Sequence, residues 1–196
     1  MTKMKILYID TTTPDLVVAV VEDNKITDVT AKAVGVHHSE MLCDKVTEAL
    51  HKANVKFADL SAYACAIGPG SFTGIRIGVS TVKGYCTAVE LPVIGVNCLE
   101  AISVSSKCGA RRSAIVDAGN GYYFADYANG VAPCLVSYDD ERVSHAGRAD
   151  SAVDYFDGAV ELIRKRFSSG QFDGSLTPLY IRRSQAEEKF ESTAIV

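Results

Sequence analysis

Two aspartates stand at matching places in the chain, each at the end of an apolar segment that is typical of a β-strand. Asp10 ends residues 4–10, Asp117 ends residues 113–117, and a short polar turn follows each of them. If the two strand ends met at a cleft, the carboxylates could hold magnesium and phosphate, with Thr11 of the first turn beside them. Aspartates in this position also accept hydrogen bonds from turn N–H groups. The residues leave both interpretations open.

A glycine-rich corner is the second candidate for chemistry. Gly68–Gly74 joins a predicted strand over residues 62–67 to a predicted helix over residues 73–89. N–H groups at such a helix start can bind phosphate, but glycines also serve a tight turn that sets the angle between strand and helix. The corner lacks the Gly-Lys-Ser/Thr ending of a Walker loop, and Thr73 stands where a dinucleotide fingerprint needs glycine.

Other catalytic signatures are missing from the sequence. His37 and His38 are adjacent, so their side chains point in different directions, and Ser71 lacks the glycine spacing of a nucleophile elbow. The six cysteines include no C-x-x-C pair, which excludes the usual zinc and redox spacings and fits a reducing compartment. We therefore predict no catalytic residue, no metal site and no cofactor in the isolated chain.

The predicted helix over residues 73–89 carries two different stripes. Ile75, Val79, Val82 and Cys86 form an apolar stripe that can bury the helix against a sheet. The neighbouring stripe is small and flat, and consists of Gly74, Gly78, Thr81 and Tyr85. Glycine inside a helix costs about 1 kcal/mol relative to alanine, so this stripe predicts that another backbone comes close. That backbone could belong to the predicted helix over residues 38–53 or to a partner subunit.

The elements that must position these residues alternate between strands and helices. The first half reads as a meander of three strands, a helix over 38–53, the strand and helix at the glycine corner, a strand over 93–96 and a helix over 99–105. At an offset of 107 residues, from Asp10 to Asp117, the order of strand, aspartate, polar turn and apolar strand returns. Similarity at a fixed offset is typical of a duplicated unit.

Composition limits the class of protein. The chain has 196 residues, 47% of them hydrophobic, and a formal charge of −4. These values exclude a disordered chain, and no apolar stretch approaches the roughly 20 residues that span a bilayer. The mildly acidic composition argues against a protein that binds nucleic acid without a partner, because such proteins need a concentrated basic surface. We expect a cytoplasmic protein without a membrane anchor.

Four segments together resemble the bacterial TsaB (YeaZ) family. The first half carries three of them: Ile9-Asp10-Thr11-Thr12, the run from Ala66 to Gly78 with its Gly-Pro-Gly-Ser-Phe-Thr-Gly core, and Leu91–Val96. Ile115-Val116-Asp117-Ala118 is the fourth, and Pro178-Leu179-Tyr180-Ile181-Arg182 is similar to the C-terminal pattern of the family. The likeness covers residues 4 to about 128 well and the stretch after them poorly.

This resemblance implies a fold and a domain organisation. The fold is the α/β, two-lobed actin/Hsp70-like (ASKHA) fold, with duplicated βββαβα-type lobes of which the second is shortened. The implied boundaries are residues 1–108 for the N-terminal lobe, 109–183 for a smaller C-terminal lobe and 184–196 for a flexible tail.

The resemblance also implies a function in which this chain itself catalyses no reaction. The chain would be a scaffold that pairs with a TsaD-like paralogue to make threonylcarbamoyladenosine in tRNA, or with a second copy when alone. A TsaE-like ATPase and tRNA would join through the complex, and ATP or ADP would bind only in that assembly. Alternatives are an autonomous nucleotide-binding enzyme that uses Asp10, Thr11 and Asp117, and a glycoprotease-like peptidase.

Pairing in the family uses the first two long helices, so the resemblance maps the interface onto residues 38–53 and 73–89. The implied interface residues are Met41, Lys45, Gly74, Gly78, Thr81 and Tyr85. The substitution Gly78→Arg is accordingly expected to leave the chain folded and to prevent pairing.

Overall fold

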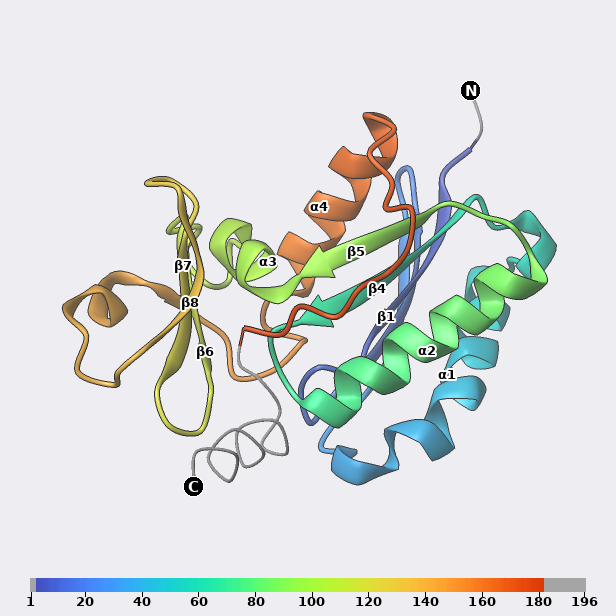
Figure 1. Cartoon of the computed structure of the whole chain (residues 1–196). Helices are drawn as coiled ribbons and strands as arrows, with labels where there is room; N and C mark the ends of the chain where they lie inside the picture. Colours follow the sequence, from blue (N-terminus) through green and yellow to red (C-terminus); the bar gives the residue numbers. More distant parts are fainter. Residues whose placement is uncertain (1–2, 182–196) are drawn as a thin grey trace, which may run out of the picture.

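The structure is a computed structural model that describes residues 3–181, and it contains two β-sheets. The larger sheet has the strand order β3-β2-β1-β4-β5, and the smaller one has the order β8-β7-β6-β9 (Figure 1). The strands of the larger sheet are β1 (Lys5–Asp10), β2 (Leu16–Glu22), β3 (Ile26–Ala31), β4 (Ala62–Gly68) and β5 (Val93–Asn97). Those of the smaller sheet are β6 (Ser113–Asp117), β7 (Tyr122–Asp126), β8 (Val131–Val136) and β9 (Gly147–Arg148).

Helices cover both faces of the larger sheet. Helices α1 (His38–Ala53) and α2 (Phe72–Ala88) lie on one face, while α3 (Cys98–Val104) and α4 (Phe156–Ser168) lie on the other (Figure 1). Three short 3-10 helices complete the described elements: Gly35–His37, Phe57–Asp59 and Glu141–His145. Within residues 3–181, no helix is both long enough and apolar enough to cross a membrane.

Strand β1 shows why the larger sheet needs two helical layers. Its side chains alternate between the two cores: Ile6 and Tyr8 pack toward α3 and α4, and Leu7 and Ile9 pack toward α1 and α2. A strand that is apolar at successive positions is stable only when both of its faces are buried. The apolar segment over residues 4–10 correctly predicts this strand.

The two sheets repeat one topology, which confirms the expected two-lobed α/β fold. Strands β1, β2 and β3 form an antiparallel meander, and β4 pairs with β1 in parallel. Strands β6, β7 and β8 form the same meander, and β9 pairs with β6 in parallel. The second copy is smaller, because β9 has two residues and the 3-10 helix Glu141–His145 stands between β8 and β9, where the first copy has α1.

Several local predictions need correction. Helix α1 begins at His38 without a capping side chain from His37, and Asn54 ends it in the left-handed conformation. Helix α2 begins at Phe72, where Ser71 caps the N–H of Gly74. Strands β8 and β9 were not predicted from the sequence.

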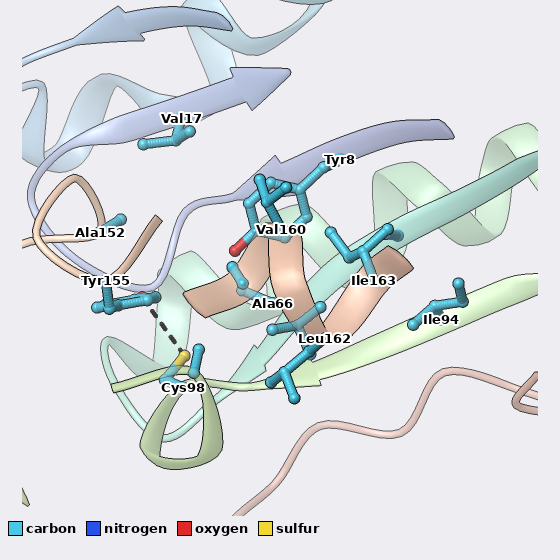
Figure 2. Packing of buried hydrophobic residues seen from close by; sticks show 14 of the residues in the cluster. Tyr8, Val17, Ala66, Ile94, Cys98, Ala152, Tyr155, Val160, Leu162 and Ile163 are labelled. Atoms are coloured by element: carbon cyan, nitrogen blue, oxygen red, sulfur yellow. Dashed lines mark hydrogen bonds between the residues drawn. The ribbon is translucent and has the colours of Figure 1, made fainter. Parts of the chain in front are cut away.

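The chain returns from the second sheet to the first. Helix α4, which lies inside the range 109–183 expected for the second lobe, packs on the larger sheet against Tyr8 and Ile94 (Figure 2). A strap over residues 173–181 then crosses the ends of β5 and β4, where Asp173 N–H donates to Val93 O (2.9 Å) and Leu179 N–H donates to Ile67 O (2.8 Å). The tail expected over residues 184–196 lies outside the described residues.

Candidate functional site

Asp10, at the end of β1, is completely buried and fully engaged by its own chain. Its Oδ1 accepts hydrogen bonds from Thr12 N–H (2.9 Å) and from the Thr12 hydroxyl (2.7 Å). Its Oδ2 accepts from the hydroxyls of Tyr8 (2.9 Å) and Tyr155 (2.8 Å). Four neutral donors therefore replace the water that a carboxylate would otherwise bind, which is how a buried charge becomes tolerable.

The groups around Asp10 stay protonated. Burial, and next the negative charge of Asp10, raise the pKa of the Tyr8 and Tyr155 hydroxyls well above the ordinary value. The same two causes raise the pKa of the Cys98 thiol, which contacts the Tyr155 hydroxyl, to about 12 (Figure 2). Both tyrosines thus remain hydrogen-bond donors to Asp10 at every pH near neutrality.

Tyr155 links α4 to the end of β1, and its removal tests the strength of that link. We expect Tyr155→Phe to lower the free energy of unfolding by about 1.5–3 kcal/mol, because a buried carboxylate loses one of its donors. Urea unfolding measures the change. The matched control is Tyr138→Phe, whose exposed hydroxyl donates to exposed Asp117 (3.2 Å) and should matter little. Equal losses for the two variants would contradict this account of Tyr155.

Asp117 has a different environment from Asp10, although the duplication places it at the same point of its sheet. Its side chain is exposed and accepts from Gly119 N–H (2.7 Å) and from the Tyr138 hydroxyl. The two aspartates share no hydrogen-bond partner, and each satisfies an N–H of its own turn. Across residues 3–181, no three histidine, cysteine or acidic side chains lie close enough to hold a metal ion. The Asp10 oxygens are sealed in the core and do not meet those of exposed Asp117 at an open cleft.

The glycine corner is filled by the turn that follows β1. The Thr11 hydroxyl donates to Gly74 O (2.6 Å), and Ser71 N–H donates to Thr12 O (2.7 Å). A Cβ on Gly70 would lie 2.4 Å from Thr12 O. The glycine-rich corner thus packs directly against the backbone of the turn after β1. This packing supports its interpretation as a tight strand-to-helix turn, in which Thr11 has a structural role.

The small stripe of α2 is confirmed as a place of close backbone approach, but its neighbour was misidentified. A Cβ on Gly74 would lie 1.9 Å from Thr11 O, and a Cβ on Gly78 would lie 2.6 Å from the Thr11 hydroxyl oxygen. Both glycines are buried against the larger sheet, not against α1 or an outer surface. Neither glycine therefore presents a surface to a partner, and we expect Gly78→Arg to disturb the packing of α2 on the sheet.

The other predicted interface residues lie in the layer of α1 and α2 and are partly buried. The Tyr85 ring packs against Phe57 (5.3 Å between ring centroids) and Tyr63 (5.9 Å), and Met41 packs against the same core. The Lys45 ammonium forms an ion pair with Glu48 (2.7 Å). Of the predicted residues, only Thr81 lines the groove that separates the two helices on their outer side.

We call this hollow the α1–α2 groove. Its volume is about 510 Å³, and it is lined by Ser39, Leu42, Cys43, Phe72, Thr73, Arg76, Ile77, Ser80 and Thr81. Residues Phe72, Arg76, Ile77 and Ser80 were not singled out from the sequence. Their spacing of three and four residues, on the face of α2 opposite to the buried stripe, is the signal that could have found them.

An aromatic cluster stands at one end of the groove. The Arg76 guanidinium lies 3.9 Å from the centre of the Phe72 ring, and its Nε donates to the Tyr180 hydroxyl (3.0 Å). The rings of Phe72 and Tyr180 are 5.0 Å apart. The end of the strap therefore orders the N-terminal turn of α2 at the rim of the groove.

Comparison with known proteins finds a matching family model and several similar proteins. Residues 23–132 match the family model described as TsaD, tRNA N6-adenosine threonylcarbamoyltransferase. The tRNA threonylcarbamoyladenosine biosynthesis protein TsaB of Escherichia coli is 35% identical over 128 residues, which are 63% of this chain and 55% of that protein. TsaB of Bacillus subtilis is 30% identical over 137 residues, 68% of this chain and 60% of that protein. The chain thus matches little more than half the length of these relatives.

A solved structure shows the same fold. The crystal structure of a Pseudomonas aeruginosa protein, described as uncharacterized and similar to peptidase YEAZ, superposes with a TM-score of 0.73 at 19% identity. The superposition covers 91% of this chain and all of that one. At this level of identity the agreement concerns the fold.

Proposed function

The chain belongs to the TsaB (YeaZ) proteins, within the family described by the TsaD model, and on that premise we propose that it takes part in tRNA threonylcarbamoyladenosine biosynthesis. In this proposal it is a subunit without catalysis of its own, which pairs with a TsaD-like paralogue. The observation that carries the proposal is the match to the family model over residues 23–132. A TsaE-like ATPase and tRNA would join the assembled complex.

The state of Asp10 supports a role without catalysis. An autonomous nucleotide-binding enzyme that used Asp10 would need its carboxylate to reach magnesium or phosphate. Here the carboxylate is sealed under Tyr155 and accepts four hydrogen bonds from Tyr8, Thr12 and Tyr155. Opening this site would leave those donors without their acceptor, which costs several kcal/mol.

The outer surface of α1 and α2 supports the pairing. The groove presents large apolar and arginine side chains next to small ones, with Phe72 37% exposed and Arg76 exposed. Aromatic residues and arginine are enriched at the energetic centres of protein interfaces, and small residues let a facing helix approach. We therefore place the TsaD-like subunit, or a second copy of the chain, against the α1–α2 groove.

A charge placed in the groove tests this assignment. Ser80 is exposed and lines the groove, so Ser80→Arg should leave the fold intact. In a pairing interface the new guanidinium would be buried without a partner, and we expect the dissociation constant for the TsaD-like subunit to rise at least about 100-fold. Co-purification and isothermal titration calorimetry measure the effect.

The control carries the same substitution on the second lobe. Ser144→Arg, at an exposed serine of the 3-10 helix Glu141–His145, should pair normally. A reconstituted modification assay should require the chain and the paralogue together. Normal pairing of Ser80→Arg would overturn the interface, and modification without the chain would overturn the proposed function.

A further inference from the structure

A second cleft lies on the opposite side of the larger sheet from the α1–α2 groove. This α3–α4 cleft, of about 570 Å³, is enclosed by α3, α4, the connector before β6 and the end of β7. Its polar lining residues are Glu100, Ser103, Arg112, Tyr127, Glu161 and Lys165. The volume lies within the range of sites that bind small molecules.

The charges of the cleft are unevenly compensated. Glu100 forms an ion pair with Arg166 (2.6 Å), which balances its charge. Arg112 and Lys165 make no ion pair with any side chain in residues 3–181. Two cationic side chains and one acid outside any ion pair in the described residues, Glu161, therefore line the same hollow, which favours an anionic ligand.

The backbone places Arg112 at the cleft in a strained conformation. Its φ of 63° lies in the left-handed region, which costs a residue with a side chain about 1 kcal/mol. Two hydrogen bonds hold it there: its N–H donates to Ser103 O (3.1 Å), and its carbonyl accepts from Tyr127 N–H (2.9 Å). Strain of this kind is concentrated at binding sites, because it fixes a side chain in advance of its ligand.

Tyr127 adds a flat apolar surface to the lining of the same cleft. Its side chain is 38% exposed, and burial of its hydroxyl, followed by the charge of Glu100, raises its pKa, so that the ring stays neutral. Tyrosine rings stack on nucleic acid bases, and arginine and lysine bind phosphate oxygens. The cleft thus combines the groups that recognise the two halves of a nucleotide.

We propose that the α3–α4 cleft binds a phosphate-bearing nucleotide, either free or as an unstacked residue of an RNA strand. Arg112 and Lys165 hold the phosphate, and the base lies against Tyr127. The site requires neither a paired subunit nor the α1–α2 groove, so it goes beyond the proposed function and can be tested separately from it. With two cations and one opposing acid, the contact is weak and supplements other contacts to RNA.

Binding to the isolated full chain tests the proposal with two probes. AMP is titrated by calorimetry, and a short fluorescein-labelled single-stranded RNA is titrated by fluorescence anisotropy. We expect Arg112→Gln and Lys165→Gln each to weaken binding about tenfold, because each removes a charge-assisted hydrogen bond to phosphate. Glu161→Gln should tighten binding, because it removes an acid from the cleft. Each lost cation should lower the slope of the logarithm of the RNA affinity against the logarithm of the salt concentration by about one unit.

The controls separate the cleft from general effects of charge. Lys32→Gln makes the same change in charge at an exposed lysine in the connection between β3 and α1, and should leave both affinities unchanged. Arg112→Gly suits the left-handed backbone, so it should fold and still bind weakly. Binding of AMP alone identifies a free nucleotide as the ligand, and binding of both probes extends the site to RNA. Unchanged affinity in Arg112→Gln and Lys165→Gln, or no binding of either probe at millimolar concentration, overturns the proposal.

Discussion

Replacing Asp10 by alanine is expected to lower the free energy of unfolding by about 3–5 kcal/mol, the cost of breaking a buried polar network by removing its charged member. Four donor groups lose their acceptor at once: the Tyr8 hydroxyl, the Tyr155 hydroxyl, and the N–H and the hydroxyl of Thr12. All of these donors are buried, so a water molecule could take the place of the carboxylate only if a cavity formed there. Since typical domains are stable by about 5–15 kcal/mol, the variant should be close to unfolded at 37 °C.

The duplicated position provides the control. Asp117→Ala removes the aspartate that ends β6, but this side chain is exposed, and water can satisfy Gly119 N–H and the Tyr138 hydroxyl. We expect a loss below about 1 kcal/mol. Urea unfolding followed by circular dichroism measures the free energy of unfolding of both variants. If this free energy falls with urea concentration at the same slope in both, only stability has changed. A loss below 1 kcal/mol for Asp10→Ala would refute the idea that this carboxylate holds α4 to the sheet.

Asp10 also shows where inference from sequence stops. The apolar run before it correctly predicts a strand that ends at Asp10. Its neighbour Tyr155 lies 145 residues later, in a stretch with weak periodicity. Spacing along the chain cannot show that a helix from the second half will seal the end of the first strand, so an open carboxylate and a sealed one looked equally plausible.

The missed strands have a related cause. Strand β8 contains Pro133 and Cys134 and lies at an edge, so it lacks the continuous β-branched character of β1 and β2. Strand β9 has two residues, too few for any period to appear. Tertiary pairing with β6 alone defines it. The edge strands β3 and β5 were predicted, so the edge position alone does not explain why β8 and β9 were missed.

The pairing interface stays a prediction, but two of the residues mapped onto it, Gly74 and Gly78, face the larger sheet. The sequence marks Gly74 and Gly78 as points of close approach, which is correct, but it does not say which backbone approaches. The contact is Thr11, 63 residues before Gly74. Because the family resemblance drew attention to α2 as a pairing helix, its small stripe was assigned to the partner, whereas the opposite stripe, with Phe72, Arg76 and Ser80, lines the groove.

Gly74→Ala should cost about 3 kcal/mol or more, although the same substitution inside a helix usually stabilises a protein. The added Cβ would lie 1.9 Å from Thr11 O and 3.0 Å from Thr11 C, so the helix or the turn after β1 must move. Either movement strains the hydrogen bond from the Thr11 hydroxyl to Gly74 O and the one from Ser71 N–H to Thr12 O. Thermal and urea unfolding of the purified variant measure the loss.

Gly84 of the same helix makes the comparison decisive. It is exposed, and nothing lies within 4 Å of the Cβ that alanine would add, so Gly84→Ala should raise the free energy of unfolding by about 0.5–1 kcal/mol. The same glycine-to-alanine substitution should therefore lower the free energy of unfolding at Gly74 and raise it at Gly84, ten residues later in the same helix. If Gly74→Ala were neutral or stabilising, α2 would have to sit farther from β1 than it does here, and Gly78 would return as a candidate for the partner's surface. If the two variants differ in sign, the small stripe belongs to the fold, and pairing must be tested through Ser80.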